Sequence, residues 1–170
     1  MVHAPLGRER VGSALWCEVA SWLIQEAEFL DEGRLDEWLE MMSREVLYEI
    51  PHRTDGGPGG EGRSFHLSED YSSLSVRIRR ASSPHAWAED PPGLARRYVT
   101  NIRVDQQADQ VRARSYVLLT KSYRGDRAPE IVGGDRHDEF TREDGALVLR
   151  RRCVVLDRVV LSGHNFGSLL

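Results

Sequence analysis

The sequence predicts an α+β fold in which helices near the amino terminus pack on a long, strongly curved, antiparallel-rich sheet. Apolar residues in the first half of the chain recur at three- and four-residue spacing, which is typical of amphipathic helices. The second half alternates apolar and polar residues in long runs separated by turn residues, which is typical of hairpin-linked strands. Because sheets of long strands twist and curl, we expect a cone whose apolar interior faces one long helix.

The chain has 170 residues, a length that suits one domain. We expect a flexible arm over residues 1–12 and a single domain over residues 13–170. A net charge of -4 argues against a nucleic-acid partner, and no apolar run approaches the roughly 18 residues of a membrane span. The first ten residues lack the apolar core of a signal peptide, so we expect a cytoplasmic location.

Three helices are expected in the first half of the chain. The first begins after Ser13, a residue type that caps helices, and ends at Gly33, because glycine tolerates the left-handed cap conformation. The second covers about residues 36–43, and the third follows Ser68 as its N-cap and presents an apolar stripe over residues 71–81. Trp16 and Trp38 are expected to pack in the core or between helix and sheet.

Strands are expected over residues 46–50, 98–105, 111–123, 130–142 and 146–161. Pro51 ends the first of them, and Asp144-Gly145 is a strong hairpin signal before the last. Alternation along the last strand predicts that Arg150 and Arg152 share one face. The glycine-rich stretch over residues 54–64 lacks the Gly-Lys-Ser/Thr ending of a phosphate loop, so we interpret it as a surface loop.

Several segments, in the right order, resemble the small (β) subunit of aromatic-ring-hydroxylating Rieske dioxygenases. They lie at residues 26–38, 46–51, 87–101, 134–142 and 152–157, so the resemblance covers most of the chain. The most informative is Trp-Ala-Glu-Asp-Pro-Pro at residues 87–92, which precedes a β-prone run at 96–102. The chain departs from the family pattern at residues 93–95, where Gly-Leu-Ala replaces a Ser-Arg-Thr-like triplet. The expected cone is similar to the nuclear transport factor 2-like (SnoaL-like, cystatin-related) fold.

This resemblance implies a structural subunit of an oxidoreductase, without a catalytic centre or cofactor of its own. It implies a homotrimer that binds three α subunits, each carrying a Rieske iron–sulfur cluster and a mononuclear iron. The complex would use electrons from NADH or NADPH to convert an aromatic compound into a cis-dihydrodiol during aromatic catabolism. The interface candidates are Trp87, Glu89, Asp90, Arg96, Arg97, Arg136 and Arg152.

The chain's own metal-ligating residues do not form the pattern of either iron centre. A Rieske centre needs two cysteines and two histidines, but neither Cys17 nor Cys153 has a histidine two positions later. The six histidines are scattered, and only His137 has an adjacent acid, Asp138, which strand geometry would point to the opposite face. We therefore expect no metal on this chain, and we expect the two cysteines to be buried free thiols rather than a disulfide.

An alternative function is a stand-alone lyase or isomerase, or a small-molecule-binding protein, that uses a pocket at the mouth of the cone. Tyr48, His52, His137 and Asp138 could then perform acid–base chemistry. The simpler interpretation is that Arg136 and Asp138 form a structural ion pair and that Tyr48 caps the cone. The alternative requires Tyr48 and the histidines to converge on a pocket, which the structure can test.

Overall fold

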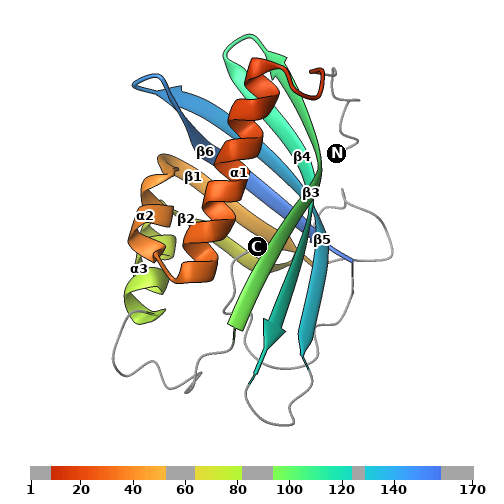
Figure 1. Cartoon of the computed structure of the whole chain (residues 1–170). Helices are drawn as coiled ribbons and strands as arrows, with labels where there is room; N and C mark the ends of the chain where they lie inside the picture. The colour runs from red at the N-terminus through yellow and green to blue at the C-terminus, as the bar shows by residue number, and fades with distance from the viewer. Residues whose placement is uncertain (1–8, 53–63, 82–93, 124–128, 158–170) are drawn as a thin grey trace.

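A computed structural model describes residues 9–52, 64–81, 94–123 and 129–157 (Figure 1). The elements in these ranges are α1 (Ala14–Glu32), α2 (Leu35–Glu40), β1 (Met42–Pro51), β2 (Phe65–Asp70), α3 (Tyr71–Ala81), β3 (Leu94–Gln107), β4 (Gln110–Ser122), β5 (Glu130–Glu143) and β6 (Ala146–Leu156). None of the described helices combines the length and the apolar character that crossing a membrane would require.

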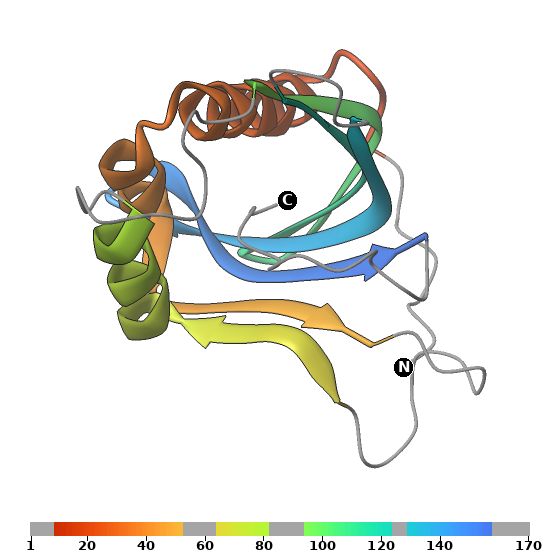
Figure 2. The same ribbon diagram turned by 90° about the horizontal axis from the view of Figure 1, so that it is seen from below.

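The strands form one six-stranded sheet in the order β2-β1-β6-β5-β4-β3. Neighbours pair antiparallel except β1 and β6, which are parallel. The sheet curves strongly, with α1 across its concave side and with α2 and α3 at the β1–β2 end (Figures 1 and 2). The predicted α+β class, with a curved sheet wrapped against the first helix, is therefore confirmed.

Local chemistry fixes both ends of α1, as the sequence predicted. The backbone N–H of Trp16 donates to the Ser13 side-chain oxygen at 3.3 Å, and Gly33 follows the helix with a φ of 72°. The Trp16 indole N–H donates to the Ile102 carbonyl at 3.2 Å, which joins the helix to β3. Trp38 is fully buried, so the packing role expected for both tryptophans is confirmed.

Several element boundaries differ from the predictions. The second helix ends at Glu40 because the chain from Met42 onward pairs with β6 and belongs to β1. Strand β2 was not predicted, and Ser68 lies inside it instead of capping a helix. The cap of α3 is Asp70, whose carboxylate accepts from the Ser73 N–H at 2.8 Å. Strand β3 begins four residues early, and β6 ends at residue 156; residues 158–161 lie outside the described ranges.

A β-bulge in β6 changes which arginine points inward. Phe140 of β5 pairs with Leu149 of β6, and Glu139 of β5 pairs with Arg151 of β6. Arg150 is therefore the extra residue on β6. The bulge shifts the alternation by one position, and both Leu149 and Arg152 are fully buried while Arg150 is exposed. The prediction that Arg150 and Arg152 share a face was wrong, because simple alternation does not include a bulge.

The core lies between α1 and the concave face of the sheet. Trp22 of α1 packs edge-on against Phe140 of β5, with ring centroids 4.8 Å apart, and its indole N–H donates to the Leu147 carbonyl at 3.1 Å. Both cysteines are free thiols, as predicted, but the prediction of burial was wrong. Cys17 is exposed on the solvent side of α1, and Cys153 is half-buried on the outer face of the sheet.

Candidate functional site

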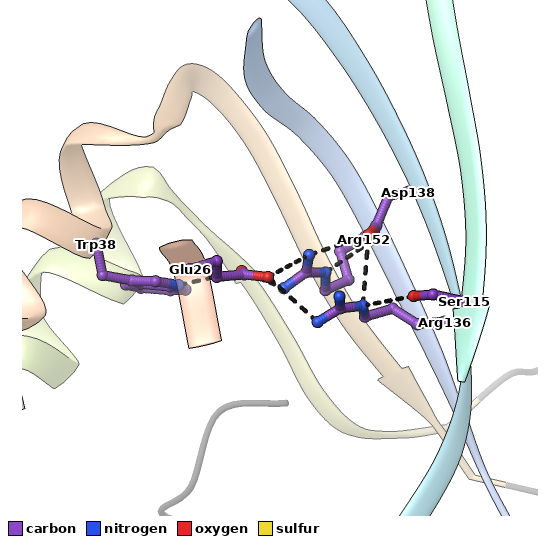
Figure 3. A network of polar contacts seen from close by, with 6 residues as sticks. All are labelled: Glu26, Trp38, Ser115, Arg136, Asp138 and Arg152. Atoms are coloured by element: carbon purple, nitrogen blue, oxygen red, sulfur yellow. Dashed lines mark hydrogen bonds and ion pairs between the residues drawn. The ribbon is translucent and has the colours of Figure 1, made fainter. Parts of the chain in front are cut away.

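Four charged side chains meet inside the cone (Figure 3). Glu26 comes from α1, Arg136 and Asp138 from β5, and Arg152 from β6, and each residue is at most 2% exposed. Arg136 and Asp138 share the concave face because they lie two positions apart on one strand. The bulge turns Arg152 to the same face. We call these four residues the buried charge cluster.

The ion pairs of the buried charge cluster occupy every carboxylate oxygen in it. Arg152 donates from Nε to Asp138 Oδ1 at 2.7 Å, from Nη2 to Asp138 Oδ2 at 3.0 Å, and from both Nη atoms to Glu26. Arg136 Nη1 lies 3.2 Å from Glu26 Oε2, and its Nε lies 3.5 Å from Asp138 Oδ2. Trp38 completes the set by donating its indole N–H to Glu26 Oε1 at 3.2 Å. The two carboxylates are therefore committed to holding the two guanidinium groups.

The two arginines differ electrostatically. Burial lowers the pKa of Arg136, and the positive charge of Arg152 lowers it further. Burial acts in the same direction on Arg152, but Asp138 and Glu26 outweigh it and hold the pKa of Arg152 well above its ordinary value. Arg136 also has a buried Nη2 without a hydrogen-bond acceptor among the described residues, while its Nε donates to Ser115 Oγ at 3.2 Å.

The four residues of the alternative acid–base set do not converge. Tyr48 is fully buried with its ring centroid 5.6 Å from Arg152 Cζ, and Asp138 belongs to the buried charge cluster. His137 points to the outer face, as the adjacency to Asp138 predicted, and its Nε2 lies 3.4 Å from a carboxylate oxygen of Asp135. His52 is exposed just beyond the end of β1. Because both oxygens of Asp138 are engaged by arginine, this arrangement offers no carboxylate base.

The interface candidates also take different places. Arg136 and Arg152 are buried within this chain, at 1% and 0% exposure, so their assignment to an interface was wrong; the bulge accounts for Arg152. The predicted structural pair of Arg136 and Asp138 is present. Arg97 forms an ion pair with Asp31 of α1 at 2.6 Å, and its side chain is 5% exposed. Arg96 is exposed on β3, and the candidates at positions 87, 89 and 90 lie outside the described residues.

The convex face of the sheet carries large apolar side chains. Tyr98 on β3 lies opposite Leu118 on β4. Ile131 on β5 pairs with Thr120, two positions after Leu118 on β4. We define the apolar outer patch as Leu94, Tyr98, Tyr116, Leu118 and Ile131, which are 42% to 57% exposed. Patches of this kind on a protein surface mark sites of association.

A shallow hollow adjoins the apolar outer patch. Its lining includes Tyr116 and Leu118 of β4 and Gly133 and Gly134 of β5. A Cβ atom at Gly133 would lie 2.5 Å from an oxygen of Asp157, so that position has no room for a side chain while the carboxylate stays in place. The convex face of the sheet is therefore hollowed as well as apolar.

Sequence reasoning did not identify Glu26 or the apolar outer patch. The signal for Glu26 is its place three residues after Leu23 and four before Leu30, on the apolar side of α1. The signal for the patch is that the outward positions of β3 and β4 hold tyrosine and leucine, where a solvated face would hold polar residues.

Comparisons with known proteins agree with one another. The family model described as "Ring hydroxylating beta subunit" matches residues 25–163. Over 172 residues the chain is 29% identical to the 3-phenylpropionate/cinnamic acid dioxygenase subunit beta of Photorhabdus laumondii, covering 95% of this chain and 94% of the relative. It is 27% identical over 154 residues to the N,N-dimethyl phenylurea N-demethylase subunit beta of Sphingobium, covering 88% of each.

Solved structures give the same result. A chain of naphthalene 1,2-dioxygenase with indole bound in its active site matches with a TM-score of 0.83 and 27% identity, covering 93% of this chain and 86% of that one. ActVI-ORFA of Streptomyces coelicolor matches with a TM-score of 0.62 and 19% identity, covering 85% of this chain and 98% of that one. A structure described as "Putative Scytalone Dehydratase", of Novosphingobium aromaticivorans, matches with a TM-score of 0.64 and 13% identity, covering 94% of this chain and 98% of that one. At these identities the likeness shows the fold alone. The predicted fold type is thus confirmed.

Proposed function

Because this chain belongs to the family of ring-hydroxylating β subunits, we propose that it is the structural β subunit of an aromatic-ring-hydroxylating dioxygenase. The observation that carries the proposal is the family match over residues 25–163. The interior agrees with a structural role, because the carboxylates of Glu26 and Asp138 are both bound to arginines. As part of such an enzyme the chain contributes to an oxidoreductase without supplying its catalytic centre.

The partner in this proposal is a larger α subunit. That subunit would carry a Rieske iron–sulfur cluster and a mononuclear iron, with electrons drawn from NADH or NADPH in the cytoplasm. Three copies of each chain would assemble, and the complex would form a cis-dihydrodiol from an aromatic compound. One relative is named as the β subunit of an N-demethylase, so we assign the choice of substrate and reaction to the α subunit.

We assign contact between copies of this chain to the apolar outer patch. The patch lies on the convex side of the sheet, because Leu118 alternates with the buried residues Val117 and Leu119. The described elements leave Tyr98 and Ile131 exposed there as well. An ion pair between Arg114 and Asp135, 2.5 Å apart, borders the patch. The two charges cancel, so the patch suits a partner surface that also carries no net charge. A closed trimer needs two different surfaces that meet, and the patch supplies one of them. The exposed Arg96 and residues 87, 89 and 90 remain candidates for the others.

Co-expression with the gene for an α subunit tests the assignment. We expect an iron-containing protein of about two to three times the mass to elute with the chain and to show the absorption of an iron–sulfur cluster. The complex, supplied with reductase and NADH, should convert an aromatic compound, whereas the chain alone should not. Turnover of an aromatic compound by the chain alone would contradict the proposal, as would failure to bind any α subunit encoded beside it.

Two matched variants test the patch in the isolated chain. Ile131 of the patch and Ile24 on the solvent side of α1 are both 54% exposed. In a monomer, an arginine at either position would therefore be solvated to a similar extent. We expect Ile131→Arg to shift the wild-type trimer to monomer at micromolar concentration, because a charge would lose water in the contact. Ile24→Arg should remain a trimer. Light scattering after size exclusion measures both, and equal behaviour of the two variants would contradict the assignment.

A further inference from the structure

Two buried hydrogen-bond donors lie next to each other on the concave face of the sheet. Ser115 of β4 is directly opposite Arg136 of β5, and both residues are 1% exposed (Figure 3). Arg136 Nε donates to Ser115 Oγ at 3.2 Å, but Arg136 Nη2 has no acceptor in the part of the chain that the structure describes. Because the Ser115 oxygen accepts from arginine, its own O–H is a second donor, and no acceptor for it lies within residues 9–52, 64–81, 94–123 and 129–157.

The planar shape of the guanidinium group directs these two donors toward one place. In arginine, the N–H bond of Nε and one N–H bond of Nη2 are parallel, which is how the group binds both oxygens of a carboxylate. Since the Nε bond of Arg136 points to Ser115, the parallel Nη2 bond points to the space beside the same hydroxyl. The hydroxyl hydrogen can rotate toward that space. A single acceptor there would receive one hydrogen bond from each residue.

The inward side chains of β4 leave room next to the two donors. Ala113 and Ser115 are the smallest side chains in the inward row that runs over residues 111–119, and every member of that row is at most 4% exposed. Ala113 lies opposite Asp138, and Ser115 lies opposite Arg136. The two smallest side chains of the row therefore adjoin the buried charge cluster.

The charge of Arg136 is less well balanced than that of Arg152. Asp138 accepts from Arg152 at 2.7 and 3.0 Å with its two oxygens, whereas Arg136 Nε lies 3.5 Å from the nearer of them. Burial and the charge of Arg152 lower the pKa of Arg136 accordingly, and a negative charge beside Nη2 would oppose that effect. A water molecule suits the place less well, because its two hydrogens would need acceptors and the carboxylates of the cluster already accept from arginine.

We propose that Arg136 and Ser115 bind a monovalent anion of the size of chloride inside the cone. The two donors need an acceptor that donates nothing in return, and a halide ion has this character. The ion would satisfy the buried guanidinium group and stabilise the fold, and it would take no part in turnover. The site is independent of the proposed dioxygenase function.

Crystals of the full-length chain grown in sodium bromide test the site directly. Bromide takes the place of chloride and scatters X-rays anomalously, so it can be told apart from water. We expect one anomalous peak per chain within hydrogen-bonding distance of Arg136 Nη2 and Ser115 Oγ. A water molecule at this place in the bromide crystals, or no density there, would overturn the proposal.

Thermal unfolding of the chain in solution gives a second measurement. Replacing gluconate, an anion too large for the site, by chloride at constant ionic strength should raise the melting temperature by at least about 2 °C. Ser115→Ala should remove most of this rise, because only one of the two donors remains. Ser43→Ala is the matched control, since Ser43 is a buried serine of β1 whose oxygen accepts from the Glu45 N–H, and it should keep the rise.

Two outcomes of the thermal measurement would also count against the anion site. One is a wild-type chain whose melting temperature is the same in gluconate and chloride. The other is an equal rise in Ser115→Ala and Ser43→Ala, which would show a general effect of the salt. None of these results affects the co-expression test, so the two proposals fail separately.

Discussion

Glu26 joins three elements inside the cone. Its oxygens accept from Trp38 of α2, Arg136 of β5 and Arg152 of β6. An unpaired carboxylate at this depth would cost several kcal/mol, and the two guanidinium groups offset that cost. The cluster as a whole is neutral, with two cations and two anions, so it can be buried only as a complete set.

Replacement of Glu26 by glutamine should lower the free energy of unfolding by about 3–5 kcal/mol, because two buried guanidinium groups would then share one carboxylate. Urea denaturation at fixed protein concentration measures the change. Glu18→Gln is the matched control on the same helix, since Glu18 pairs with Arg142 at 2.7 Å with both side chains about 40% exposed. It should cost less than about 1 kcal/mol. Similar losses in the two variants would show that the cluster does not depend on Glu26.

At the level of single elements, prediction succeeded where short-range chemistry decides the structure. Ser13 and Gly33 bound α1 because a cap needs only its own neighbours. Strand β2 was missed because it is six residues long and only Leu67 in it is buried, so it shows too little alternation. The bulge at Arg150 could not be predicted either, because it depends on pairing with β5, a contact that the sequence of β6 does not contain.

The end of α1 offers a test of this local control. Gly33 has a φ of 72°, and a Cβ atom there would meet nothing within 4 Å, so a side chain would fit and only the backbone would be strained. Gly33→Ala should therefore cost about 1–2 kcal/mol in unfolding free energy. Gly33→Asn should cost less, because asparagine tolerates the left-handed region. Urea denaturation measures the free energy of unfolding of both variants. If Gly33→Ala lost no more stability than Gly33→Asn, the left-handed φ of residue 33 would not determine the cap.

Across the whole molecule, the sheet has two unequal edges. Strand β3 is tied to α1 by the Asp31–Arg97 ion pair and by the hydrogen bond from Trp16 to Ile102. Strand β2 is shorter and, among the described strands, pairs only with β1. Strands β4, β5, β6 and β1 each have neighbours on both sides. The stability of the backbone should therefore fall toward the β2 edge.

Hydrogen exchange followed by mass spectrometry can measure this gradient. We expect amides of β5 and β6 to exchange slowest, because they open only with most of the fold. Peptides from β2 should exchange faster by at least about tenfold, because an edge strand opens without disturbing the core. Equal protection of β2 and β5 would contradict this picture of the sheet.

The sequence was sufficient for the class of fold, and the resemblance to a family supplied the function. It was not sufficient for the interior of the cone. Tyr48 and Asp138 were singled out for chemistry and do lie inside, but their neighbours are Arg152 and Glu26, which come from segments far apart in the chain. Which charges meet depends on how α1 crosses the sheet, and no local pattern records that crossing.

The extra residue at Arg150 has a consequence for reading other chains of this kind. A chain that lacks a counterpart of Arg150 would still direct its leucine and its arginine inward, but with one intervening residue in place of the two that separate Leu149 from Arg152 here. In a sequence alignment, a gap opposite Arg150 therefore does not mean that the inner surface of the other chain differs. An alignment without that gap would place a solvent-facing arginine of one chain opposite a buried arginine of the other.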